Sequence, residues 1–147
     1  KSFDKKPLSQ EDIENVFSLE ISSNEKKLFD FLLEKKEMFI VDFFSNYPGE
    51  IKNPNSYILN ATNQFNVLHR MITTDDSSFS FLKKLWPPIL GKNKEKFIRN
   101  IKFWKKSSVE EALLILRETE LKIRKNSKLS PKRIISFAFL NICLLNN

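Results

Sequence analysis

The chain has 147 residues, of which 41% are apolar and 14 are Phe; this content excludes an intrinsically disordered chain, and the length suits one domain. With only two Gly and one Cys, the composition disfavours a fold rich in tight hairpins and excludes a disulfide framework. The net charge of +7 is uneven, because residues 92–147 hold 14 Lys and Arg against 5 Asp and Glu, so the C-terminal third favours contact with phosphate or with an acidic partner.

Helix-start signals and apolar spacing predict four helices in the first half of the chain. Ser9, ahead of acidic residues, is an N-cap that begins a short helix. Ser22 and Glu25 have the spacing of a capping box and begin a second helix. A third helix ends at an Asn-Tyr-Pro-Gly breaker, and the fourth has the clearest amphipathic pattern. The expected spans are 9–17, 22–36, 37–46 and 54–72, and the buried stripe of the fourth is Ile58, Ala61, Phe65, Leu68 and Ile72.

Four more helices are predicted in the second half, and proline places two of their ends. Pro87 and Pro88 end a short helix near Trp86, because proline lacks an N–H donor and blocks the α region for the residue before it. Ser130 and Pro131 begin the last helix as N-cap and first-turn residue. The chain is therefore predicted to be all-α, a compact bundle of about six to eight helices. The expected spans are 77–86, 94–105, 107–126 and 131–145, and the second has a buried stripe of Phe97, Ile101 and Trp104.

The sequence offers no set of residues for catalysis or for a cofactor. Gly49 and Gly91 are the only glycines, so a Gly-rich phosphate loop is excluded, and with it an intrinsic ATP site. His69 lies one position beyond the buried stripe of its helix and is interpreted as a structural or surface residue. One His and one Cys, Cys143, do not complete a zinc site or a Cys/His catalytic pair. We expect no catalytic residue, no cofactor and no metal.

The last predicted helix is apolar nearly all round. It is shorter than the roughly 20 apolar residues that a membrane span needs, so we expect it to be buried centrally in its own domain or against another subunit. Ile135, Phe139 and Leu145 are therefore candidate residues of a subunit interface. The lone thiol of Cys143 and the lack of a secretory signal indicate a cytoplasmic protein.

A Pro-Pro pair and a small basic cluster precede a helix that ends in Trp, and the next helix ends with Glu and a basic residue four positions apart. This order and spacing resemble the delta subunit of the bacterial DNA polymerase III clamp loader. Residues 8–13 resemble the closing helix of that family's second, lid-like domain, and residues 41–71 resemble its first collar helices. The matching residues are Pro87, Pro88, Lys92, Trp104, Glu120 and Arg124.

Two loops depart from the family pattern. Leu90-Gly91 stands where an aromatic pair commonly follows the prolines, and Leu129-Ser130-Pro131 replaces the usual Gly-Pro before the final helix. Both departures weaken the case that the family's detailed loop contacts are present here, and both leave the helical frame intact.

The resemblance implies that residues 1–20 end a lid-like domain and that residues 21–147 form a helical C-terminal collar domain for oligomerisation. Such a domain holds subunits together and catalyses nothing. Its parent is a non-catalytic subunit of the DNA polymerase III holoenzyme, the DNA-directed DNA polymerase and nucleotidyltransferase complex of DNA replication, and serves to place the sliding clamp on primed DNA. The implied partners are the other clamp loader subunits in a hetero-oligomeric ring, the sliding clamp through an N-terminal domain absent here, and primer-template DNA.

Two further features allow alternative interpretations. Trp86 and Trp104 could stack on bases, although aromatic residues at helical spacing are usually core. Glu120 and Arg124 have the spacing of a stabilising helix pair. Given the resemblance, the same pair is also a candidate for a subunit contact.

The rival function is a free-standing helical nucleic-acid-binding domain that uses the basic C-terminal third. Candidates for contact with DNA or a partner, or for a merely solvated face, are Lys92, Lys94, Arg99, Lys102 and Lys106.

Overall fold

The computed structural model describes residues 23–125 and 128–145, so the helix expected near residue 9 and the whole lid-like segment 1–20 lie outside the described residues. Within the described ranges the chain is helical and contains no strand, which confirms the predicted all-α bundle. The elements are α2 (Ser23–Leu33), α3 (Glu37–Asn46), α4 (Pro54–Thr73), the short 3₁₀ helix η1 (Ser80–Lys84), α5 (Gly91–Asn100), the 3₁₀ turn η2 (Ile101–Phe103), α6 (Lys106–Lys125) and α7 (Pro131–Cys143).

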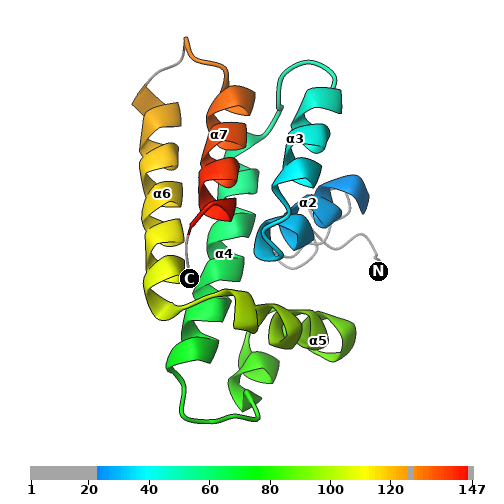
Figure 1. The fold of residues 1–147 in the computed structure, drawn as a ribbon, viewed down its shortest axis with the longest axis vertical. Helices are drawn as coiled ribbons and strands as arrows, with labels where there is room; N and C mark the ends of the chain where they lie inside the picture. Colours follow the sequence, from blue (N-terminus) through cyan, green and yellow to red (C-terminus); the bar gives the residue numbers. More distant parts are fainter. Residues whose placement is uncertain (1–22, 126–127, 146–147) are drawn as a thin grey trace, which may run out of the picture.

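Two long helices and the C-terminal helix form the body of the molecule. α4 packs along α6, and α7 lies in front of α4 with α6 on one side and α3 on the other (Figure 1). α2 packs on α3 and α7, while α5 crosses the lower end of the bundle (Figure 1). None of the helices in the described ranges is long and apolar enough to cross a lipid bilayer.

The core forms around α4 and Trp104. Phe65 of α4 is completely buried and meets the Trp104 ring edge to face, with the ring centroids 4.9 Å apart. Such a pair contributes about 0.5–1.5 kcal/mol beyond the area that it buries. Phe97 is buried too, so the prediction that the Phe65 and Trp104 stripes lie inside is confirmed except at Ile101, which is half-buried because α5 ends at Asn100 and Ile101 begins η2. At the end of α4 the buried position is Met71 rather than Ile72, which is half-buried.

A left-handed residue ends α2 and turns the chain into α3. Lys35 has a φ of 57°, its N–H donates to Leu32 O at 3.2 Å, and Lys36 N–H donates to Phe31 O at 2.9 Å. These two bonds form a Schellman motif, which satisfies carbonyls that a helix end otherwise leaves unpaired. A lysine in place of the usual glycine costs backbone energy, so the position needs compensation from elsewhere.

Trp104 and the end of α7 supply that compensation. The Trp104 indole Nε1–H donates to Leu33 O at 2.8 Å, and Lys35 Nζ donates to Leu145 O at 2.8 Å. The same ammonium lies 4.4 Å from the centroid of the Trp104 ring, as in a cation–π pair. Burial lowers the pKa of Lys35. The end of α2, Trp104 and the end of α7 thus form one junction, which we call the Trp104 junction.

The short helix expected up to Trp86 differs from the prediction in length and type. η1 is a 3₁₀ helix that ends at Lys84. The Asp76 carboxylate accepts hydrogen bonds from the N–H and hydroxyl groups of Ser78, which precedes η1, and of Ser80, its first residue. These bonds hold the pKa of Asp76 well below its usual range. Trp86 falls in the loop after η1 and is 67% exposed, so its assignment to the core is wrong.

The starts of the last three α-helices agree with the sequence to different degrees. α5 begins at Gly91, earlier than residue 94, and Gly91 has a φ of 58°, which a glycine adopts without strain. α6 begins at Lys106, one residue before the predicted start at Ser107. Ser108 lies in the first turn of α6, where its hydroxyl oxygen accepts a hydrogen bond from the Lys105 N–H at 2.9 Å, so Ser108 is not the residue that precedes the helix. The N-cap at Ser130 with Pro131 behind it is confirmed.

Candidate functional site

The start of α7 is held by the loop between α3 and α4. Ser130 Oγ accepts from Arg133 N–H at 3.3 Å and donates to Glu50 Oε2 at 2.6 Å, while Lys132 N–H donates to Glu50 Oε1 at 2.7 Å. The carboxylate therefore satisfies one of the free N–H groups of the first turn and faces the positive end of the helix dipole. The hydrogen bond from Ser130 is the main cause that lowers the pKa of Glu50. Lys132 Nζ also donates to Tyr47 O at 3.1 Å.

α7 is thus anchored at its start by Glu50 and at its end by Lys35, and these two anchors fix which side of the helix faces the core. The buried residues fall at the three-and-four spacing of one helix face and include Ile135 and Phe139, both with no exposed surface. Their assignment to a subunit interface is corrected, because a side chain enclosed by its own domain has no surface left for a partner. Leu145 is half-buried and packs on the core edge.

The opposite side of α7 carries an apolar residue that the sequence analysis missed. Phe137 is 66% exposed, and Arg133 and Asn141, one turn before and after it, are exposed too. The missed signal was the second stripe, since residues 133, 137 and 141 recur every four positions between the buried ones. Because the helix is apolar nearly all round, its sequence does not show which apolar residue lies in this outward stripe.

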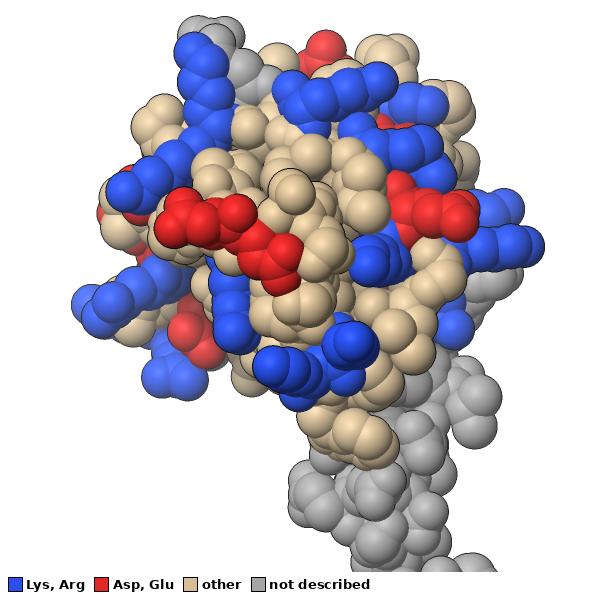
Figure 2. Space-filling view, turned by 90° about the horizontal axis from the view of Figure 1, so that it is seen from below, with Lys and Arg blue, Asp and Glu red and all other residues tan. Residues whose placement is uncertain are grey.

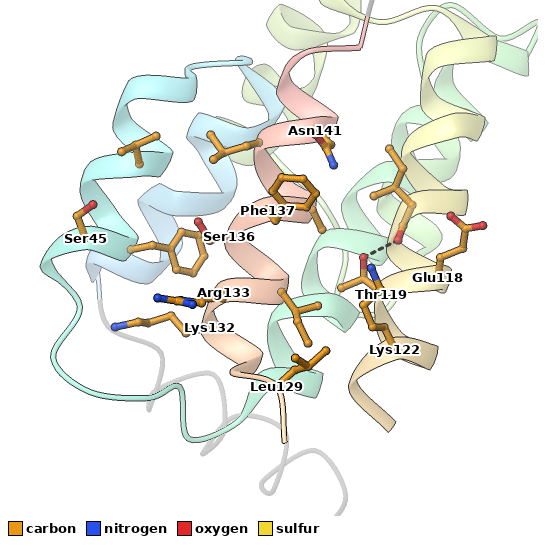
Figure 3. Close-up of a pocket in the computed structure, with 16 residues that line it drawn as sticks. Ser45, Glu118, Thr119, Lys122, Leu129, Lys132, Arg133, Ser136, Phe137 and Asn141 are labelled. Carbon is orange, nitrogen blue, oxygen red and sulfur yellow. Dashed lines mark hydrogen bonds between the residues drawn. The ribbon is translucent and has the colours of Figure 1, made fainter. Parts of the chain in front are cut away.

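Phe137 stands in a groove that runs along α7. Its walls are Val41 and Ser45 of α3 on one side and Ile115 and Thr119 of α6 on the other, and its volume is about 690 Å³. Figure 3 shows Phe137 pointing out of α7 between the two neighbouring helices, with Arg133 and Lys132 toward its start. We call this hollow the α7 groove; its remaining lining residues are Phe44, Glu118, Lys122, Leu129, Lys132, Arg133, Ile134, Ser136, Ala138, Leu140 and Asn141.

The polar rim of the α7 groove is mainly basic. Lys132 and Arg133 of α7 and Lys122 of α6 stand against a single acid, Glu118 (Figure 3). Thr119 is buried and donates its hydroxyl to Ile115 O at 2.6 Å within α6, so it contributes no free donor to the groove. The groove therefore combines an apolar floor with a net positive rim.

The five basic candidates lie on α5, η2 and the start of α6. Lys94 is half-buried and the other four are exposed, and none of the five forms an ion pair with another of the described residues. Lys96, in the same segment, is paired with Asp30 of α2 at 2.9 Å. On the lower face of the molecule, Lys and Arg surround an uncharged centre and alternate with acids, rather than forming one continuous patch (Figure 2).

The remaining singled-out residues form local pairs on helix surfaces. Arg124 donates to Glu120 Oε2 at 3.3 Å on α6, both partly exposed, and such a pair contributes only about 0.3–0.5 kcal/mol. Neither residue lines the α7 groove. His69 Nε2 lies 2.9 Å from Glu110 Oε2 and links α4 to α6. Among the described residues no group of three His, Cys, Asp or Glu side chains could hold a metal ion.

Comparison with known proteins identifies no family for the chain. No protein-family model, no curated protein and no solved structure matches the chain. Among the described residues, the α7 groove and the segment from Trp86 to Lys106 both offer physical grounds for a function, and each supports a different kind of partner.

Proposed function

We propose that the chain is the collar domain of a clamp loader delta subunit, a non-catalytic module that holds subunits together during DNA replication. The resemblance in the order and spacing of Pro87, Pro88, Lys92 and Trp104 supports the family. The observation that carries the contact function is the exposed Phe137 in the α7 groove. An exposed aromatic side chain in a concave apolar surface is typical of the central part of a protein interface.

Other apolar side chains on the two helices that wall the groove are also exposed. They are Met38 and Val41 of α3 and Leu114 and Leu121 of α6, and of these four Val41 lines the α7 groove. A neighbouring domain that covers the groove would bury Phe137 and Val41, whereas a free monomer leaves them in water. Because helices of clamp loader collars pack side by side, a helical neighbour is the occupant that the proposal implies.

Reconstitution with the other clamp loader subunits of the same organism tests the proposal. The chain should co-elute with them in size-exclusion chromatography and stay bound at high salt, because apolar packing resists salt whereas phosphate-like electrostatic contacts do not. Phe137→Glu should weaken this association about 100-fold or more, since the new charge would be desolvated in the interface.

A matched control separates contact from folding. Leu59 of α4 is 60% exposed and does not line the α7 groove, so Leu59→Glu should leave both the association and the thermal unfolding temperature unchanged. Phe137→Glu should likewise keep the unfolding temperature, because Phe137 is already in water in the free chain. A chain that elutes alone when all the other subunits are present would disprove the collar assignment.

A second candidate function, contact with single-stranded nucleic acid, is favoured by the exposure of Trp86. The indole lies in a loop preceded by Lys83 and Lys84 and followed by Lys92, and an exposed ring among cations suits base stacking. Binding of a labelled oligothymidine should weaken about 5- to 100-fold in Trp86→Ala and fall steeply with salt. Equal binding by the wild type and Trp86→Ala would remove this candidate.

A further inference from the structure

The rim of the α7 groove carries information about the partner beyond its apolar floor. We propose that the groove binds one amphipathic helix of the neighbouring subunit, with an apolar stripe over Phe137 and carboxylates next to Arg133 and Lys132. This inference rests on the proposed function, because the neighbour is taken to be a helical domain of the same ring.

The shape of the groove fits a helix. Its floor follows one side of α7, where Ile134, Phe137 and Asn141 recur at intervals of one helical turn. Its walls are two further helices, α3 and α6 (Figure 3). A hollow of this form is filled by a helix whose apolar residues recur at i, i+3, i+4 and i+7.

The charge of the groove determines which charged residues the bound helix should carry. Lys132 and Arg133 occupy the first turn of α7, which contains no acidic residue, so their charges add to the positive end of the helix dipole. Glu50 offsets part of this potential, but it bonds Ser130 and the Lys132 N–H at the very start of the helix. Arg133 is exposed and its side chain forms no ion pair with another described residue. Carboxylates are therefore the groups that this end of the groove attracts.

Nucleic acid fits the same surface less well. A phosphate backbone prefers a continuous row of cations, whereas the cations in the rim of the α7 groove are divided between α6 and α7 and share the rim with Glu118. A partner helix with both leucine-like and acidic residues matches both properties of the groove at once.

Synthetic helical peptides provide a direct probe. The first has leucines at i, i+3, i+4 and i+7 with glutamates beside the stripe, the second replaces those glutamates by lysines, and the third scrambles the first. Fluorescence anisotropy at physiological salt should give saturable binding of the acidic peptide. The lysine peptide should bind about tenfold more weakly, and the scrambled peptide should not saturate, because charge alone does not fill the floor.

Charge reversal in the protein locates the effect. Arg133→Glu should weaken the acidic peptide about fivefold and strengthen the lysine peptide, because an exposed ion pair is replaced by a repulsion. Lys84→Glu, an equal charge change in η1, should leave both affinities unchanged. Phe137→Glu should abolish binding of the acidic peptide.

Each other outcome contradicts either the acidic helix as the occupant or the collar assignment, and the two are distinguishable. Equal affinity for the two charged peptides, or equal effects of the Arg133 and Lys84 changes, would overturn the acidic helix as the occupant even if ring reconstitution succeeds. Dimerisation of the chain alone that Phe137→Glu abolishes would assign the groove to a second copy instead. Failure of reconstitution with intact, selective peptide binding would overturn only the collar assignment.

Discussion

The two tryptophans show how differently neighbouring parts of one chain use the same residue type. Trp104 is buried, its indole N–H bonds the end of α2, and Lys35 lies over its ring. Trp86 stands 67% exposed in the loop after η1. The Trp104 junction links three distant segments of the chain, whereas the Trp86 loop ends a short 3₁₀ helix. Burial together with a partner for the indole N–H, and not residue type, decides which of them stabilises the fold.

The largest expected effect is the removal of the Trp104 side chain. Trp104→Ala should lower the free energy of unfolding by about 3–5 kcal/mol, because it leaves a cavity beside Phe65 and strips Leu33 O of its donor. Urea denaturation followed by circular dichroism measures this loss.

A milder change keeps the comparison measurable if the alanine variant does not fold. Trp104→Phe retains most of the ring but not the N–H, and should lower the free energy of unfolding by about 1–3 kcal/mol. A loss under about 0.5 kcal/mol in either variant would contradict the structural role of the Trp104 junction.

A second, smaller effect concerns the lysine over the Trp104 ring. Lys35→Ala removes the hydrogen bond to Leu145 O and the cation–π contact but keeps a left-handed non-glycine residue, so we expect a loss of about 1–2 kcal/mol. Lys35→Gly should lose less than Lys35→Ala, since glycine relieves the backbone cost at this position. Equal urea midpoints for the two variants would show that backbone strain contributes nothing there.

The thiol at the end of α7 gives a pH-dependent prediction. Burial is the main cause that raises the pKa of Cys143 to about 12, from 9.0 in an unfolded chain. The folded state therefore holds the thiol proton over a range in which the unfolded state releases it, and stability is lost as pH rises above 9. Between pH 8 and pH 10 the wild type should lose about 1 kcal/mol more than Cys143→Ala.

A thiol reagent checks the same group independently. At pH 8 the native protein should react with it far more slowly than the urea-unfolded protein, because Cys143 is buried and protonated. An immediate, stoichiometric reaction of the native protein would contradict the burial of this end of α7.

The smallest expected effect on stability completes the comparison. Trp86→Ala should change the free energy of unfolding by less than about 0.5 kcal/mol, because its side chain is already in water. In Trp104→Phe, where Trp86 is the remaining tryptophan, acrylamide should quench the fluorescence efficiently, whereas in Trp86→Ala it should quench Trp104 poorly. Similar quenching in the two variants would show that the two environments do not differ.

The sequence by itself determined the all-α class, the spans of the long helices and most of the core. Caps and breakers are local signals, so Ser130 with Pro131 and the end of α3 at Asn46 agree with the structure. The same is true of the α4 stripe, because a period of three to four residues depends on helix geometry alone. The resemblance to a collar domain and the roles of the five basic candidates and of Glu120 with Arg124 stay predictions.

Only the tertiary structure decided which side of α7 faces water. α7 has apolar residues on nearly every side, so its sequence did not distinguish Ile135 and Phe139, which are buried, from Phe137, which lines the groove. Its orientation comes from contacts with distant residues, Glu50 at its start and Lys35 at its end. Likewise, a left-handed lysine is stabilised at the Trp104 junction by partners that its own sequence neighbourhood does not contain. Local periodicity reports on helices one at a time, whereas exposure depends on the neighbours that long-range packing brings to each face.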